Sequence, residues 1–230
     1  MVLLGLANTV SLIVVFLFLQ AEQGRRMVEQ DAALTQSRIS IMLSQIQPHF
    51  LYNSLNTIRY LCKADPDRAQ KAVDDFAAYL RGNLDSLKRT APVSLDTELE
   101  YIRIYLSLEK MRFDDELQIV YDLQATGFLL PALTVQLLVE NAVKYGVSKK
   151  EGGGTVSIAT RENPNCFTIS VSDDGVGYDP SAAQEDGRTH IGIDNVRAPL
   201  AAMCHGSLYI KSRPNAGTTA TITIPKEGME

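Results

Sequence analysis

The sequence contains little cysteine and no tryptophan. Its 3 cysteines, Cys62, Cys166 and Cys204, lie far apart and form no CxxC spacing, which excludes a disulfide framework and a zinc knuckle and fits a reducing compartment. An excess of basic residues is also absent, because 22 Lys and Arg stand against 27 Asp and Glu, a formal net charge of −5. The overall charge therefore indicates no nucleic-acid partner, and any anionic ligand would be held by local features.

Repeats and low-complexity segments are absent too, and the composition is that of a globular protein. Hydrophobic residues make up 45% and charged residues 21% of the 230 residues, close to the average for folded domains. At about 150 residues per domain, this length predicts one large or two small domains.

Charged residues are missing from the first 20 positions, MVLLGLANTVSLIVVFLFLQ. A helix over residues 1–20 would be about 30 Å long, the thickness of the hydrocarbon core of a membrane. The alternative, a signal peptide, needs a basic start and an A-x-A-like cleavage site, which AEQGRR after Gln20 does not supply. We expect a transmembrane helix, which could also be the last span of a longer receptor. Because Arg25 and Arg26 follow it and no Lys or Arg precedes it, we expect a single-pass cell-membrane protein whose remaining residues are cytoplasmic.

Residues 21–90 have the pattern of a helical hairpin. Up to about Lys63 the apolar residues recur at spacings of roughly three, four and seven, as in a helix that continues the span. Asp65 and Pro66 can cap and begin a second helix that ends near Leu87. Its expected apolar face consists of Val73, Phe76, Leu80 and Leu84. A hairpin cannot bury two apolar stripes alone, so we expect a homodimer that forms a four-helix bundle.

Residues 91–230 alternate between helical and strand-like segments. Ser94 can cap a helix to about Arg112. Pro131 is expected to begin an apolar helix that Gly146 ends. A further helix is expected around 194–203, and strands are expected over 116–123, 155–161, 167–173, 207–212 and 218–224. This order predicts an α+β domain, a sheet covered on one face by helices.

The segment SQIQPHFLYNSLNTIRYL places a proline and a histidine inside the first soluble helix. A mid-helix proline costs about 3 kcal/mol or more, and Pro48 could introduce a bend that turns the imidazole of His49 outward. A neutral histidine is a good nucleophile and can accept a phosphoryl group, while Asn53, one turn later, can orient its ring. The alternative is an ordinary bundle histidine. The Pro48 and Asn53 context and the motifs that follow favour a catalytic role.

A second set of candidate residues is spread over a helix and two loops. Asn141 and Lys144 are three residues apart, hence on one face of the predicted helix, and suit Mg²⁺ and phosphate oxygens, respectively. In SVSDDGVGYD, Asp173 can accept a hydrogen bond from an exocyclic amine, and Gly175 and Gly177 let the backbone approach a flat ligand. Taken alone, this DxGxG segment could equally be a tight turn.

Two later segments complete this set. Gly192 lies at the beginning of a predicted helix, whose amides can bind phosphate. Gly217 and Thr218 lead into the last predicted strand, and the polar stretch from Pro180 to Thr189 is typical of a lid.

Five segments follow one another in the order PHFLYNSLNTI, LVENAVKYG, DDGVGYD, IGIDNVR and GTTATITIP. They resemble the motif boxes of the LytS-type sensor histidine kinases, whose ATP-binding half has the Bergerat fold shared with gyrase, Hsp90 and MutL. The resemblance runs from about Ser44 to Pro225 and implies a bacterial two-component kinase that uses ATP and Mg²⁺.

The resemblance also implies roles for single residues. His49 would be the phosphoacceptor, Asn141 the Mg²⁺ ligand, Asp173 the carboxylate that reads adenine, and Thr218 the partner that shares a water with it. Other residues implied to contact the nucleotide are Lys144, Tyr145, Gly175, Gly177, Gly192, Asn195 and Gly217. An aspartate of a response regulator would then receive the phosphoryl group.

The sequence departs from the family pattern at a few positions. Tyr145 replaces a usual His, which affects a minor phosphate contact; His190 replaces the first Gly of a glycine box; and Pro199 replaces a common Arg and is expected to kink its helix. Gyrase-like ATPases place their water-activating Glu one turn before the Asn, where this chain has Leu137 rather than Glu140. That difference argues against ATP hydrolysis as the function of this domain.

Two other classes of protein share part of this pattern. A Bergerat ATPase or protein serine kinase, such as an anti-sigma factor, would lack the PHFLYN helix. In a non-catalytic membrane scaffold, nucleotide binding would only order the lid, and the intact Asn141 and Asp173 argue against that reading.

Overall fold

The computed structural model describes residues 48–89, 91–179 and 191–226. The predicted span 1–20, the helix leading to Pro48, the bend expected there, and the predicted lid lie outside the described residues. From His49 onward the chain forms one compact unit. Within the described ranges, no helix is long and apolar enough to cross a membrane.

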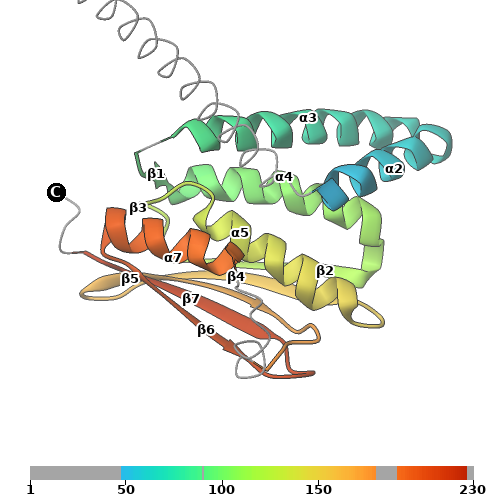
Figure 1. Cartoon of the computed structure of the whole chain (residues 1–230). Coiled ribbons are helices and arrows are strands. Elements are labelled where there is room, and N and C mark those ends of the chain that lie inside the picture. Colours follow the sequence, from blue (N-terminus) through green and yellow to red (C-terminus); the bar gives the residue numbers. More distant parts are fainter. Residues whose placement is uncertain (1–47, 90, 180–190, 227–230) are drawn as a thin grey trace, which may run out of the picture. The chain divides into compact units, whose positions relative to one another are not determined.

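The described chain begins with the predicted helical hairpin, α2 (Pro48–Ala64) and α3 (Pro66–Lys88) (Figure 1). The side chain of Asp65 accepts a hydrogen bond from the Arg68 N–H at 3.1 Å, and Pro66 occupies the first turn. This arrangement is the cap that the sequence predicted.

The apolar face predicted for α3 is only partly covered, since Phe76 and Leu80 pack against the core. Val73 and Leu84 are 49% and 42% exposed, whereas the buried residues of α3 include Ala69, Ala72, Tyr79 and Ser86. Helix α3 approaches α4 (Leu95–Phe113) closely at Gly82. A Cβ built on Gly82 would lie 2.5 Å from Cε1 of Tyr101.

Helix α4 begins after Ser94, whose hydroxyl accepts from the Thr97 N–H at 3.3 Å, as predicted. Helix α5 (Thr134–Asn141) begins later than the sequence predicted, because Leu133 adopts a left-handed φ of 64° at its N-cap. The Glu98 carboxylate on α4 caps α5 instead, accepting hydrogen bonds from the backbone N–H groups of Leu133, Val135 and Gln136.

The end of α5 also differs from the expectation. The chain continues through a single π turn, η2 (Ala142–Gly146), into a 3₁₀ turn, η3 (Val147–Lys149). Gly146 therefore does not end the helix. Its missing side chain serves a close approach instead, because a Cβ there would collide with the Asp173 carboxylate.

The predicted strands form one sheet in the order β2 (Leu117–Leu123), β4 (Gly154–Glu162), β5 (Cys166–Asp173), β7 (Thr218–Pro225), β6 (Ser207–Ser212). Only the β2–β4 pair is parallel. Helix α7 (Ile191–Cys204), which contains Pro199, lies with α4, α5 and the hairpin on one side of this sheet (Figure 1). The short strands β1 (Val93–Ser94) and β3 (Leu129–Leu130) and the 3₁₀ turn η1 (Asp114–Glu116) were not anticipated.

The core lies between the sheet and these helices. Its sheet side consists of alternate buried residues, Val156 and Ile158 on β4, Ile169 and Val171 on β5, and Ile222 and Ile224 on β7. The mixed helix-and-sheet fold is thus the predicted α+β arrangement, with the alternation that a sheet covered on one face requires.

Candidate nucleotide site and phosphoacceptor histidine

Three of the predicted motifs meet at one end of the sheet. A Cβ on Gly175 would collide with the backbone of Gly146, and one on Gly217 would collide with the Asp173 carbonyl. The Val176 N–H donates to the Gly146 carbonyl at 3.4 Å. We call Gly146, Asp173, Gly175, Gly217 and Thr218 the sheet-end site. At the three glycine positions the neighbouring atoms lie too close for a side chain, which explains why glycine is found there.

The polar groups of this site form a row across neighbouring strands. Asp173 on β5 pairs with Thr218 on β7, and Thr218 pairs with Ser212 on β6. Directly paired residues point to the same face. In β5 and β7 that face also carries Val171 and Ala220, which are buried. The row therefore lies on the helix-covered side of the sheet.

Asp173 is the half-buried acceptor of the row. Burial raises the pKa of its carboxyl group, and backbone hydrogen bonds from Gly175 and Thr218 act in the opposite direction. The Gly175 N–H donates to Oδ1 of Asp173 at 2.9 Å. A partly desolvated carboxylate with remaining acceptor capacity suits an exocyclic amine.

Ser212 belongs to the row but was missed from the sequence. It is 7% exposed, and its Oγ lies 2.8 Å from Oγ1 of Thr218, 2.9 Å from the Tyr178 N and 3.2 Å from the Gly217 carbonyl oxygen. The available signal was a serine at an inward position of SLYIKS, where Leu208 and Ile210 precede it.

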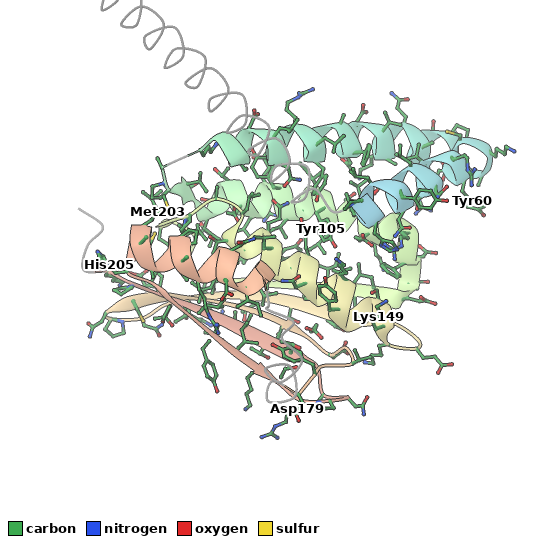
Figure 2. All side chains as sticks on the ribbon, viewed as in Figure 1. Tyr60, Tyr105, Lys149, Asp179, Met203 and His205 are labelled. Atoms are coloured by element: carbon green, nitrogen blue, oxygen red, sulfur yellow. The ribbon has the colours of Figure 1, made fainter. Side chains whose placement is uncertain are left out.

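Gly177 adopts a left-handed φ of 57°, and a Cβ there would collide with the Arg213 carbonyl. The Asn215 N–H donates to the Val176 carbonyl at 2.6 Å, which ties the same loop to the β6–β7 turn. Asp179, which follows this loop, lies at the opposite end of the sheet from Met203 and His205 (Figure 2).

Asn141 and Lys144 lie at the C-terminal end of α5 and in the π turn, respectively. The expectation that they share a face used α-helical geometry, which does not apply through a π turn. Asn141 is half-buried, and its side-chain amide forms no hydrogen bond with any described residue. The Lys144 Nζ lies 4.6 Å from the ring centroid of Tyr145, which is 57% exposed.

A bound Mg²⁺ would find a suitable oxygen at Asn141. Among the described residues, no group of three His, Cys, Asp or Glu side chains could hold a metal ion. Mg²⁺ usually keeps several waters and takes its other ligands from substrate phosphates. One unpaired amide oxygen near the end of α5 therefore fits an ion carried by a nucleotide.

The remaining predicted contacts lie on α7. Gly192 is in its first turn and Asn195 is exposed in its second, while Val196 and Leu200 anchor the helix in the core. The roles assigned to Gly192 and Asn195 stay predictions.

His49 is exposed at the beginning of α2. The Asn53 Nδ2 lies 3.1 Å from its Nδ1 and 3.4 Å from its Nε2, so the amide is within hydrogen-bond reach of the ring, and its role in orienting the ring stays a prediction. The neighbouring Phe50 is buried, with ring centroids 4.6 Å from Tyr79 and 5.1 Å from Tyr105. Phe50 anchors this turn and leaves the imidazole facing outward.

A buried polar network, also missed from the sequence, links the hairpin to α5. The Tyr79 hydroxyl donates to Oε1 of Glu140 at 3.2 Å, and Gln136 Nε2 donates to the same atom at 2.8 Å. Gln136 Nε2 also donates to Oδ1 of Asn83 at 2.9 Å. Burial and the Glu140 charge raise the pKa of Tyr79. Glu140 is thus engaged inside the protein, which suits a structural residue better than a water-activating base.

Profiles of two protein families match different parts of the chain. The family described as histidine kinase matches residues 37–117, and the family described as histidine kinase-, DNA gyrase B-, and HSP90-like ATPase matches residues 130–228. The fold is therefore of the histidine-kinase ATPase type. The first match extends through α4, past the domain boundary expected at residue 90, and that boundary stays a prediction.

Individual relatives cover most of the chain. YwpD of Bacillus subtilis (strain 168) is 39% identical over 196 residues, which cover 83% of this chain and 70% of YwpD. The sensor histidine kinase YpdA of Escherichia coli (strain K12) is 33% identical over 214 residues, 90% of this chain and 36% of YpdA. The sensor protein LytS of Bacillus anthracis is 30% identical over 210 residues, 86% of this chain and 36% of LytS. The chain thus spans about a third of the length of these two sensor kinases. It belongs to the histidine kinase family and is similar to LytS sensor proteins over most of its length.

Proposed function

We propose that this chain is the kinase region of a two-component sensor, which transfers the γ-phosphoryl group of ATP to His49 and then to an aspartate of a response regulator. The observation that carries the proposal is the exposed imidazole of His49, held by Asn53, in a chain whose sheet-end site offers the Asp173 carboxylate to an amine. Both groups belong to motifs of the family.

In the first step, a ring nitrogen of His49 attacks the γ-phosphorus. The N–P bond forms as the bond from the γ-phosphorus to the bridging oxygen breaks, and ADP leaves with that electron pair. The ring proton passes to solvent, which the exposed position of His49 allows. In the second step, a carboxylate oxygen of the regulator takes the phosphoryl group and the imidazole leaves.

The sheet-end site would position the nucleotide for this transfer. Asp173 accepts a hydrogen bond from the exocyclic amine of adenine, and the backbone at Gly175 and Gly177 lies against the base. Phosphoryl transfer depends chiefly on position and on charge neutralisation. Mg²⁺ would be held by the Asn141 oxygen and would supply part of that neutralisation, and Lys144 and the N–H groups of the first turn of α7 would supply the rest.

The hairpin would also form the dimer contact. Leu55 and Tyr60 on α2 are 55% and 71% exposed, and Val73 and Leu84 on α3 are exposed as well. Tyr60 projects outward from α2 (Figure 2). These apolar side chains on two adjacent helices support a four-helix bundle of two copies. The charge-free residues 1–20 support attachment of the assembly to the cell membrane.

Labelling with γ-³²P-ATP tests the proposal. The chain has 3 histidines, and His205, exposed with a φ of 49°, is a matched control because Asn tolerates that conformation. We expect His49→Asn to lose an acid-labile, base-stable label while still binding ATP, and His205→Asn to keep both. Normal labelling of His49→Asn, or an acid-stable label in the unmodified chain, would overturn the proposal.

A further inference from the structure

We propose that Ser212 is a positioning residue for adenine recognition, acting through the hydroxyl group of Thr218. The inference rests on the proposed function, since it concerns the same nucleotide site. It assigns a role to a buried side chain outside the sequence motifs.

The register of three strands places Ser212 beside the predicted adenine contacts. Asp173, Thr218 and Ser212 are successive partners across β5, β7 and β6, and all three point to the helix-covered face. Ser212 is therefore the buried end of the row, while Asp173 is half-buried. A change at Ser212 reaches a ligand through Thr218.

The hydrogen bonds of Ser212 favour one direction for the Thr218 proton, because all three contacts of the Ser212 hydroxyl are satisfied together only when Thr218 donates. Ser212 Oγ must accept from the Tyr178 N–H, because a backbone N–H can only donate. The single Ser212 proton can go to the Gly217 carbonyl, which can only accept. The remaining contact, 2.8 Å between Ser212 Oγ and Thr218 Oγ1, is then a bond that Thr218 donates.

This assignment leaves Thr218 Oγ1 with free lone pairs and no free proton. The row then presents two acceptors, Asp173 and Thr218, to a ligand. Adenine carries an amine donor where guanine carries a carbonyl acceptor, so this arrangement favours adenine. Without Ser212, the Thr218 hydroxyl could rotate and donate, and part of that preference would be lost.

The experiment compares ATP and GTP binding, with Mg²⁺, to the full chain by calorimetry. We expect Ser212→Ala to weaken ATP binding about three- to tenfold and to lower the ATP-to-GTP affinity ratio by a similar factor. Ser212→Thr keeps a hydroxyl and should restore the ratio. Ser207→Ala, at an exposed position of the same strand, should leave it unchanged.

A double-mutant cycle separates positioning from folding. Thr218→Val should lower the ratio as Ser212→Ala does, and the double variant should lower it no further. An unchanged ratio in Ser212→Ala, even with a lower melting temperature, would overturn the inference, as would additive effects in the double variant. Because binding needs no His49, loss of labelling alone leaves this inference standing. A complete lack of ATP binding by the unmodified chain would remove the proposed function itself.

Discussion

The hairpin and the sheet-end site hold their functional side chains in opposite ways. In the hairpin, His49 is exposed, and so are Leu55 and Tyr60 along the same helix. In the sheet-end site, Asp173 is half-buried and backbone contacts at Gly146 fix the surroundings. The proposed nucleotide site is thus largely preformed, whereas the proposed phosphoacceptor, His49, lies on an exposed surface.

That difference has a physical reason. A nucleotide is recognised by a few polar groups at fixed positions. Packed backbone and strand register hold those groups in place. A phosphoacceptor must meet the ATP-binding part first and a second protein later, so it needs access rather than enclosure. The predictions below test the two halves of this comparison, beginning with the largest expected effect.

Asp173→Asn should have the largest effect on the preformed site. It replaces a charged acceptor by an amide that can also donate, and we expect ATP binding to weaken by about 10- to 100-fold. Calorimetry measures the change. The neighbouring Asp174→Asn is the control, because Asp174 is exposed and pairs with Lys150 at 3.2 Å. Equal affinities in Asp173→Asn and the unmodified chain would remove the adenine role.

Gly146→Ala tests whether close packing builds the site. Its methyl group would collide with the Asp173 carboxylate, so we expect ATP binding to weaken at least about tenfold. Gly127→Ala is the matched control, because nothing lies within 4 Å of a Cβ there. If both alanine variants bound ATP alike, the site would be more adaptable than its contacts indicate.

The buried carboxylates between α4 and α5 predict a dependence of stability on pH. Burial raises the pKa of Glu98, and separately of Glu109, to about 7 from 4.5. A raised pKa in the folded state stabilises the protein fully below about pH 4.5, and this stabilisation is lost as the pH rises through about 7. We expect the free energy of unfolding to fall by on the order of 5 kcal/mol between pH 5 and pH 8, about half of it from each group.

Urea titrations at several pH values measure this slope. Glu98→Gln should reduce it by about half, because Glu109 still titrates. A free energy of unfolding that rises with pH over this range would contradict the assignment.

Tyr79→Phe should have the smallest effect, on the contact between the hairpin and α5. It removes the 3.2 Å hydrogen bond to Glu140, which keeps its bond from Gln136, so we expect a loss of about 1 kcal/mol in the free energy of unfolding. Tyr60→Phe is the control, since Tyr60 is 71% exposed on the same hairpin. A larger loss in Tyr60→Phe than in Tyr79→Phe would show that the buried bond is not what holds the two parts together.

The sequence predicted the elements that depend on local patterns. The caps at Asp65 and Ser94 predicted where two helices begin, and the alternation of apolar residues predicted the strands of the sheet to within a few residues. The π turn, the delayed start of α5 and the buried face of α3 were missed, because each depends on a contact between distant segments. The capping of α5 by Glu98 is such a contact, and no local sequence pattern predicts it.

In the candidate site, too, the residues in local motifs were predicted and the residues that depend on distant contacts were missed. Glycines and charged residues in ordered motifs pointed to the neighbourhood of Asp173 and to His49. Ser212 and Tyr79 were missed because their partners, Thr218 and Glu140, are assigned by strand register and helix packing.

Direct location of the phosphoryl group tests the central claim. The full chain is incubated with Mg·ATP, digested at neutral pH, and sequenced by mass spectrometry with a fragmentation method that preserves the N–P bond. The account predicts a single phosphorylated histidine, His49, in the peptide that contains PHFLYN. A phosphoryl group on a serine, a threonine or another histidine, with His49 unmodified, would contradict it.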